Sequence, residues 1–230
     1  MNKAVWLLLV IGCLMYAGSR FIQHDSNYKL STTLSSGPAP SLVQKIMAGP
    51  FTGIAADYNI LGAFFLYDQI KTQLPDSKKI QGWKQLAAHL DRTSEIDPWF
   101  MDTYRLASGL LAYSDYDTSR NAVSILEKGT KARTWDWELP FLAGFISYDK
   151  LADNKLAFDY MKIATERPGV PPLAIGLASR ILNREKGMDA SIFFLQYLLK
   201  TMPEAYHDQI QRRIRKLKQT EPHFNGETAL

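Results

Sequence analysis

Apolar residues recur with helical spacing from Ser41 to residue 219, and no segment in that range shows the two-residue alternation of a strand. Residues 54–72 carry an apolar face with only three charged side chains, which favours a helix buried on most of its surface over one lying in a membrane interface. Pro75 ends this run, and Asp76 or Ser77 is placed to cap a second helix ending near Ile96. The pattern therefore predicts an all-α domain over residues 42–219.

Two stretches of this domain match each other at a constant offset of 35 residues. Residues 106–130 read LASGLLAYSDYDTSRNAVSILEKGT, and residues 141–165 read FLAGFISYDKLADNKLAFDYMKIAT. Seven aligned positions keep their size class, and three of them are identical: Gly109 with Gly144, Tyr113 with Tyr148, and Ala122 with Ala157. A fixed period between about 20 and 50 residues indicates an array of repeated structural units.

With these positions the chain resembles the tetratricopeptide repeat family, whose unit of roughly 34 residues is a pair of helices, A and B. Ala122, Ala157 and Ala190 fit the small position of helix B, while Pro98, Pro168 and Pro203 fit the proline that closes a unit. The resemblance covers about residues 51–203, although the first unit matches loosely and the helix A glycines precede a large residue instead of following one. It implies an α-solenoid of about four helix pairs.

The small residues have a packing explanation, because two helices approach closely only where their side chains are small. Gly109 is expected opposite Ala122, and Gly144 opposite Ala157. Large residues one turn away, including Tyr113 and Tyr148 late in helix A, are expected to fill the space between units.

The resemblance also implies protein–protein interaction through a groove that helix A residues line. In this sequence those residues are Tyr104, Leu111, Leu142, Ile146 and Asp149. The set is mostly apolar and lacks the basic residues that would capture a terminal carboxylate. Replacement of Tyr104 by alanine is expected to weaken partner binding without loss of stability, whereas loss of stability would place it in the core.

The final helix, expected over residues 204–219, has Ile210, Ile214 and Leu217 on one side and a basic cluster on the others. That cluster could bind anionic lipid or nucleic acid. We favour a capping helix, because the last unit of an array needs a polar outer face. Residues 220–230 are expected to form a disordered tail.

The N-terminal segment differs from the rest of the chain. Residues 4–19 are uncharged and mostly apolar, which predicts a signal anchor or transmembrane helix over residues 1–23. Residues 24–41 are rich in Ser, Thr, Gly and Pro and are expected to be a flexible linker. Lys3 before the run places the following domain on the extracytoplasmic face, in the periplasm, although Arg20 and Lys29 weaken that orientation.

Cys13 gives the same segment a second interpretation. It follows Val10, Ile11 and Gly12, a sequence that resembles a relaxed bacterial lipobox, in which the cysteine is acylated. The apolar run continues past Cys13, however, so we favour the uncleaved anchor. The run is shorter than the roughly 20 residues of a full span and longer than the core of about 7 to 15 residues in a cleaved signal peptide. A span and a signal peptide would both send the rest of the chain across a membrane.

Composition narrows the function further. The net charge is only +4, with 27 basic and 23 acidic residues interspersed, which does not suggest nucleic-acid binding. The single cysteine excludes an internal disulfide and a multi-cysteine metal site. None of the four histidines has metal spacing, and Asp102, Asp117 and Asp149 fall at or near predicted helix ends.

The paired tryptophans Trp135 and Trp137 could stack a sugar or a base, but packing at the junction between units is favoured because Trp99 stands at the equivalent junction. We therefore expect no catalytic role, cofactor, metal or small-molecule substrate. The sequence favours a membrane-anchored scaffold or adaptor that binds protein partners in a cell-envelope complex. Two alternative functions are also compatible with the sequence. One is a pilotin-like or envelope-assembly lipoprotein, and the other is a non-catalytic accessory subunit of a membrane complex.

Overall fold

A computed structural model describes residues 40–114 and 116–219 of the chain. The predicted anchor, most of the predicted linker and the predicted tail lie outside these residues, as does Cys13. Within the described part, none of the helices combines the length and the hydropathy that a membrane span requires.

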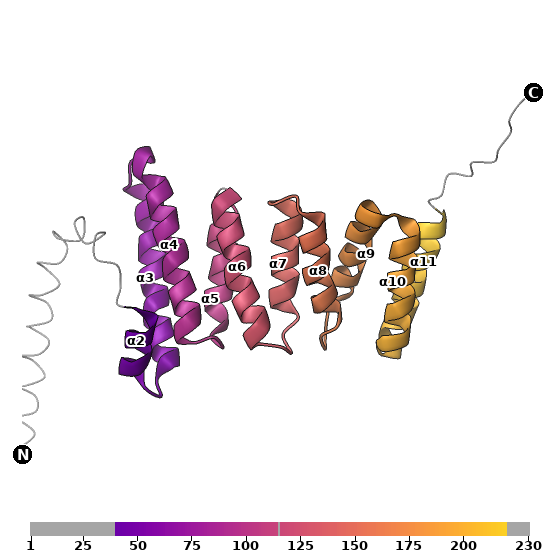
Figure 1. The fold of residues 1–230 in the computed structure, drawn as a ribbon, viewed down its shortest axis with the longest axis horizontal. Helices are drawn as coiled ribbons and strands as arrows, with labels where there is room; N and C mark the ends of the chain where they lie inside the picture. Colours follow the sequence, from indigo (N-terminus) through magenta and orange to yellow (C-terminus); the bar gives the residue numbers. More distant parts are fainter. Residues whose placement is uncertain (1–39, 115, 220–230) are drawn as a thin grey trace, which may run out of the picture. The chain divides into compact units, whose positions relative to one another are not determined.

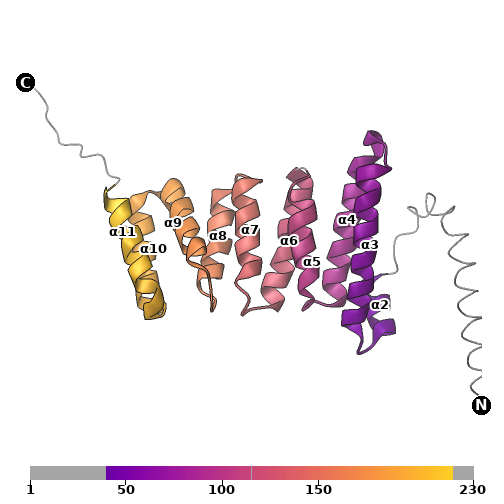
Figure 2. The same ribbon diagram turned by 180° about the vertical axis from the view of Figure 1, so that it is seen from behind.

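The described regular elements are all helical, and most of them form consecutive antiparallel pairs (Figures 1 and 2). We call the first member of each pair its A helix and the second its B helix. The pairs are α3 (Thr52–Thr72) with α4 (Asp76–Ile96), α5 (Met101–Leu106) and η2 (Ala107–Leu111) with α6 (Tyr116–Ala132), α7 (Glu138–Asp149) with α8 (Asn154–Thr165), and α9 (Pro172–Lys186) with α10 (Met188–Thr201).

Three further elements flank the pairs. Helix α2 (Ser41–Ala48) precedes the first pair, and the short η3 (Glu204–Tyr206) leads from the fourth pair into α11 (His207–Gln219). The predicted all-α array of about four helix pairs with a C-terminal capping helix is thus confirmed. Helix α2 was not predicted as a separate element; its Ser41 hydroxyl donates to the Glu95 carboxylate on α4 at 2.6 Å.

The caps agree only in part with expectation. Helix α4 has Pro75 at its N-cap, with Asp76 as the first helical residue, and no side chain caps it. Helix α8 is capped by Asp153, whose carboxylate accepts from the Leu156 backbone N–H at 2.9 Å. At the C-terminal end, Ile210 and Leu217 of α11 are buried against the last pair, as predicted for a capping helix.

The contact predicted at Gly144 is confirmed. A Cβ atom placed there would lie 2.9 Å from the Ala157 carbonyl oxygen and 3.0 Å from Met161 Cγ. Ala157 and Ala122 are fully buried at the small positions of α8 and α6. The third pair therefore depends on a glycine for the close approach of its helices.

The equivalent prediction for Gly109 is wrong. Gly109 is exposed, and a Cβ atom there would meet nothing within 4 Å. The reason is that η2 is a π-helical turn, which holds one more residue than an α-helical turn. Before the turn, the buried Ala107 corresponds to Ala143, an offset of 36; after it, Ala112 corresponds to Ser147, an offset of 35. The extra residue rotates Gly109 away from helix B.

Ala190 also needs correction, because it is only partly buried. The fully buried small residue of α10 is Ser191, whose hydroxyl donates to the Ser179 carbonyl on α9 at 2.9 Å. The offset between equivalent positions of α8 and α10 is 34 residues. Ala157 and Met161 of α8 are buried, and their buried equivalents in α10 are Ser191 and Leu195. The preceding turn at Gly187 is short, and sequence spacing alone did not locate it.

Candidate interaction surfaces

Three of the five residues predicted to line a groove lie in the core instead. Tyr104, Leu111 and Ile146 are at most 2% exposed. The Tyr104 hydroxyl donates to the Pro98 carbonyl at 2.8 Å, and burial raises the Tyr104 pKa to about 12. Leu142 is partly buried and Asp149 is exposed, so only these two reach the surface as predicted.

The A helices of the second and third pairs are joined at both ends of their exposed sides. At one end, the Arg105 guanidinium donates from two nitrogens to the two Glu138 carboxylate oxygens, both at 3.1 Å. At the other end, the Lys150 ammonium lies 4.5 Å from the centroid of the Tyr113 ring, which is 60% exposed. Tyr113 is thus a surface residue, whereas Tyr148 is partly buried in the neighbouring core cluster.

Between these two bridges lies the surface that we call the A-helix face. It consists of Leu106, Gly109 and Leu110 on α5 and η2, and Leu142 on α7. The three leucines are partly buried, so each presents apolar surface while packing on the core below. Helical spacing places Leu142 on the same side of α7 as Glu138 and Asp149.

Gly109 gives this face its open centre. No atom lies within 4 Å of the position of a Cβ atom, so a Cβ atom could be added there without a clash. The π-helical turn around Gly109 is a less regular geometry than a continuous α-helix, and such turns occur frequently at functional sites. The A-helix face therefore combines partly exposed leucines, free space and a local departure from regular structure.

The tryptophans pack on one another at the junctions between pairs. The Trp135 and Trp99 rings have centroids 4.8 Å apart at an interplanar angle of 31°, and Trp137 packs edge-on against Phe141. The Arg133 guanidinium donates to the Trp99 carbonyl at 2.7 Å and lies over the Trp135 ring. The rings contact each other at the junction, as the packing interpretation predicts, while Trp99 and Trp135 keep 58% and 44% of their surface exposed.

A surface cavity of about 270 Å³ lies between the B helices α4 and α6. Its Lys128 ammonium is 2.6 Å from the Asp91 carboxylate and 3.1 Å from the Glu95 carboxylate. Two carboxylates thus neutralise this lysine. Among the described residues, no three His, Cys, Asp or Glu side chains are grouped to hold a metal ion.

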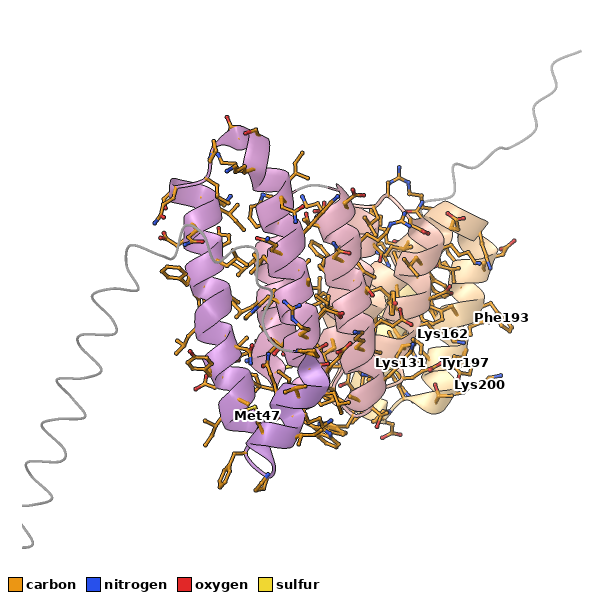
Figure 3. The ribbon with its side chains drawn as sticks, turned by 60° about the vertical axis from the view of Figure 1, so that its left-hand side comes forward. Met47, Lys131, Lys162, Phe193, Tyr197 and Lys200 are labelled. Atoms are coloured by element: carbon orange, nitrogen blue, oxygen red, sulfur yellow. The ribbon has the colours of Figure 1, made fainter. Side chains whose placement is uncertain are left out.

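The B helices otherwise present charged surface (Figure 3). Lys131 on α6 pairs with Glu127 at 2.6 Å, and Lys162 on α8 lies 3.8 Å from Glu166. The partners of each pair are one helical turn apart. Such solvent-exposed ion pairs contribute little to the stability of the fold. The aromatic side chains of Phe193 and Tyr197 on α10 are also exposed.

Helix α3 is much more exposed than its apolar sequence predicted. Its buried residues are Ala56, Asn59, Ile60, Ala63 and Ile70. The exposed large apolar residues of α2, α3 and the loop between them are Leu42, Val43, Ile46, Met47, Phe51, Ile54, Tyr58, Leu61, Phe64 and Phe65. We call this surface the N-terminal apolar face. The sequence showed its apolar character and placed α3 in the first unit, but predicted that most of its surface would be buried; among the described residues, no helix pair precedes α3 to cover it.

Comparison with known proteins leaves the chain without an assigned family. No family model matches it, and no curated protein matches it. Among solved structures, the chain is similar to the one titled "Crystal structure of MamA", with 17% sequence identity and a TM-score of 0.38. The match covers 63% of this chain and 92% of that chain. So distant a likeness carries no conclusion about function.

Proposed function

We propose that this protein is a membrane-tethered adaptor that binds a protein partner through its A-helix face, in assembly or stabilisation of a cell-envelope complex. The observation that carries the proposal is the open centre of that face at Gly109, beside Leu106, Leu110 and Leu142. Partly exposed leucines around an open position provide apolar contact for an inserted side chain.

The tether is the uncharged run at residues 4–19, which lies outside the described residues. Its apolar character and the linker after it support an anchored domain, and Lys3 before the run supports the periplasmic side of a bacterial membrane. The chain itself is proposed to be non-catalytic and to use no cofactor. A role as an accessory subunit of a membrane complex would use the same surfaces.

In-cell photo-cross-linking of the full-length chain tests the partner surface. A photoreactive residue at Tyr113 or Asp149, which flank the A-helix face, is expected to give one discrete cross-linked protein that mass spectrometry identifies. The matched control position is Lys155, which is exposed on α8. Failure of both face positions to cross-link, or the same product from Lys155, would refute the proposal.

A substitution then separates binding from stability. Gly109→Phe fills open space, so we expect loss of the cross-link from Tyr113 with an unchanged melting temperature. A cross-link of wild-type yield in this variant would show that the partner does not enter the face at Gly109.

The lipoprotein alternative rests on the residues before Cys13. Labelling cells with a fatty-acid analogue distinguishes it, with Cys13→Ser as the control. Labelling that depends on Cys13 would show that the anchor is a lipid and not a transmembrane helix. The proposed binding surface would be unchanged. Absence of label on the wild-type chain would remove this alternative.

A further inference from the structure

The N-terminal apolar face has a spacing suited to another helix. Along α3 its exposed residues Ile54, Tyr58, Leu61 and Phe65 follow one another at intervals of four, three and four, and Phe51 precedes them by three. This alternation averages 3.5 residues, the repeat of a seam at which two helices pack side by side. The exposed fractions of Ile54, Tyr58 and Leu61 are 69%, 77% and 65%, so no described part of the chain covers them.

The size of the face fits a stable interface. Aromatic side chains present about 150 to 250 Å² each, so the ten exposed apolar residues together offer on the order of 1,000 Å². A standard protein–protein interface takes about 800 Å² from each partner. Exposed apolar patches on monomeric proteins are usually only about 300–600 Å².

Charge on the two helices favours contact with an identical face. Lys45 and Lys71 are balanced by Asp57 and Asp68, so α2 and α3 together carry no net charge. In a two-fold contact each surface meets itself, and a face with excess charge of one sign would repel its copy. The balance also gives no basic patch for an anionic lipid surface.

The other end of the row of helices does not complement this face. Helix α11 presents the exposed Arg212, Arg215, Lys216 and Lys218 on its outer sides. Stacking of one chain's N-terminal end on another chain's C-terminal end would bury these charges against apolar residues, at a high cost in desolvation. The N-terminal apolar face is therefore complementary to the same face of a second copy, and not to the charged surface of α11.

We propose that the N-terminal apolar face binds the same face of a second copy of this chain, with α3 packed along the partner's α3 in a closed two-fold dimer. This surface is separate from the A-helix face on α5, η2 and α7. Dimerisation therefore leaves the proposed partner site free, and tethers in a shared membrane would hold both copies at one surface.

Cross-linking of full-length protein in native membranes tests the contact. In a Cys13→Ser background, which removes the native cysteine, Leu61→Cys is expected to give a dimer band with a short bis-maleimide, and Asp159→Cys on α8 is not. Absence of the Leu61→Cys dimer would overturn the proposal and indicate cover by lipid, another protein or the N-terminal segment. Equal bands from both positions would also overturn it, since they would reflect random collision.

Co-purification of two differently tagged copies gives a second measurement. Leu61→Asp places a charge in the seam and is expected to reduce co-purification by at least about tenfold, whereas Asp159→Lys should have no effect. Circular dichroism melting checks that both variants are folded, and Tyr58→Asp replaces Leu61→Asp if the latter is not. Unchanged co-purification in the folded seam variants would refute the dimer. Gly109→Phe should retain it, which separates this proposal from partner binding.

Discussion

Single residues decide how closely the helices of this protein approach. A Cβ atom at Gly144 would meet backbone, and one at Gly129 would lie 2.6 Å from Tyr104 Cε1, so both glycines fill tight contacts. Gly109 has the same residue type and no neighbour at the Cβ position. Identical residues at matched positions of two repeats therefore have different physical roles, one in packing and one at the surface.

Gly144→Leu is expected to destabilise the fold, by about 1 to 3 kcal/mol or more, because the added side chain must displace the Ala157 backbone or Met161. Urea unfolding followed by circular dichroism measures the change. The matched variant is Gly109→Leu, which is expected to leave the free energy of unfolding unchanged or to raise it slightly through better helix propensity. Equal stability of the two variants would contradict the role of Gly144.

At the scale of elements, α3 and α4 are joined by a partly buried polar contact as well as by apolar packing. His89 Nε2 on α4 donates to the Asn59 carbonyl on α3 at 2.7 Å. Asn59 in turn donates from its side chain to Gln44 on α2 at 2.9 Å, so one chain of contacts joins three helices. Burial lowers the pKa of His89 below its ordinary value of 6.5, although the bond to the Asn59 carbonyl opposes the shift.

The lowered His89 pKa predicts a loss of stability on acidification. Because the unfolded chain binds a proton more readily, the stability that neutral His89 contributes is present above pH 6.5 and is lost as the pH falls through the folded pKa. We expect the melting temperature, measured by circular dichroism, to fall as the pH is lowered from neutral through the folded pKa of His89. In His89→Gln this drop should shrink; an equally steep drop would assign the effect to other groups.

At the scale of the molecule, the described helices contain two clusters of buried residues that adjoin at α7 and α8. One cluster extends from Ile60 to Tyr160, and the other from Ala157 to Leu217. Arg167, which follows α8, donates to the backbone carbonyls of Thr130, Arg133 and Asp136 at 2.7, 3.0 and 2.5 Å. This single side chain ties the second and third pairs together, and such contacts between neighbours hold a repeat array together.

Arg167→Met is therefore expected to lower stability by about 1 to 3 kcal/mol, since it leaves these carbonyls without their donor, and to reduce cooperativity between the halves. All five tryptophans lie at or before Trp137, so fluorescence reports on the N-terminal part of the chain while circular dichroism reports on all helices. We expect the two unfolding curves to separate in the variant and to coincide in the wild type. Coincident curves in both would contradict the linking role.

The sequence determined the elements of this protein, because helical periodicity and turn residues are local properties. It predicted helix pairs, the close contact at Gly144 and the capping helix α11. It misplaced Tyr104, Leu111 and Ile146, because which side of an A helix faces inward depends on the helices packed against it. It misplaced Gly109, because a one-residue π-helical insertion leaves no clear mark in composition.

Only the tertiary structure decided what is exposed. The apolar pattern of α3 would be the same whether or not another helix covered it. Its exposure follows from the position of α3 at the start of the row of described helix pairs. Gly109 likewise matched Gly144 in sequence, and only packing separated a surface glycine from a core one. Local pattern fixes which residues form a helix, whereas burial depends on neighbours that are distant along the chain.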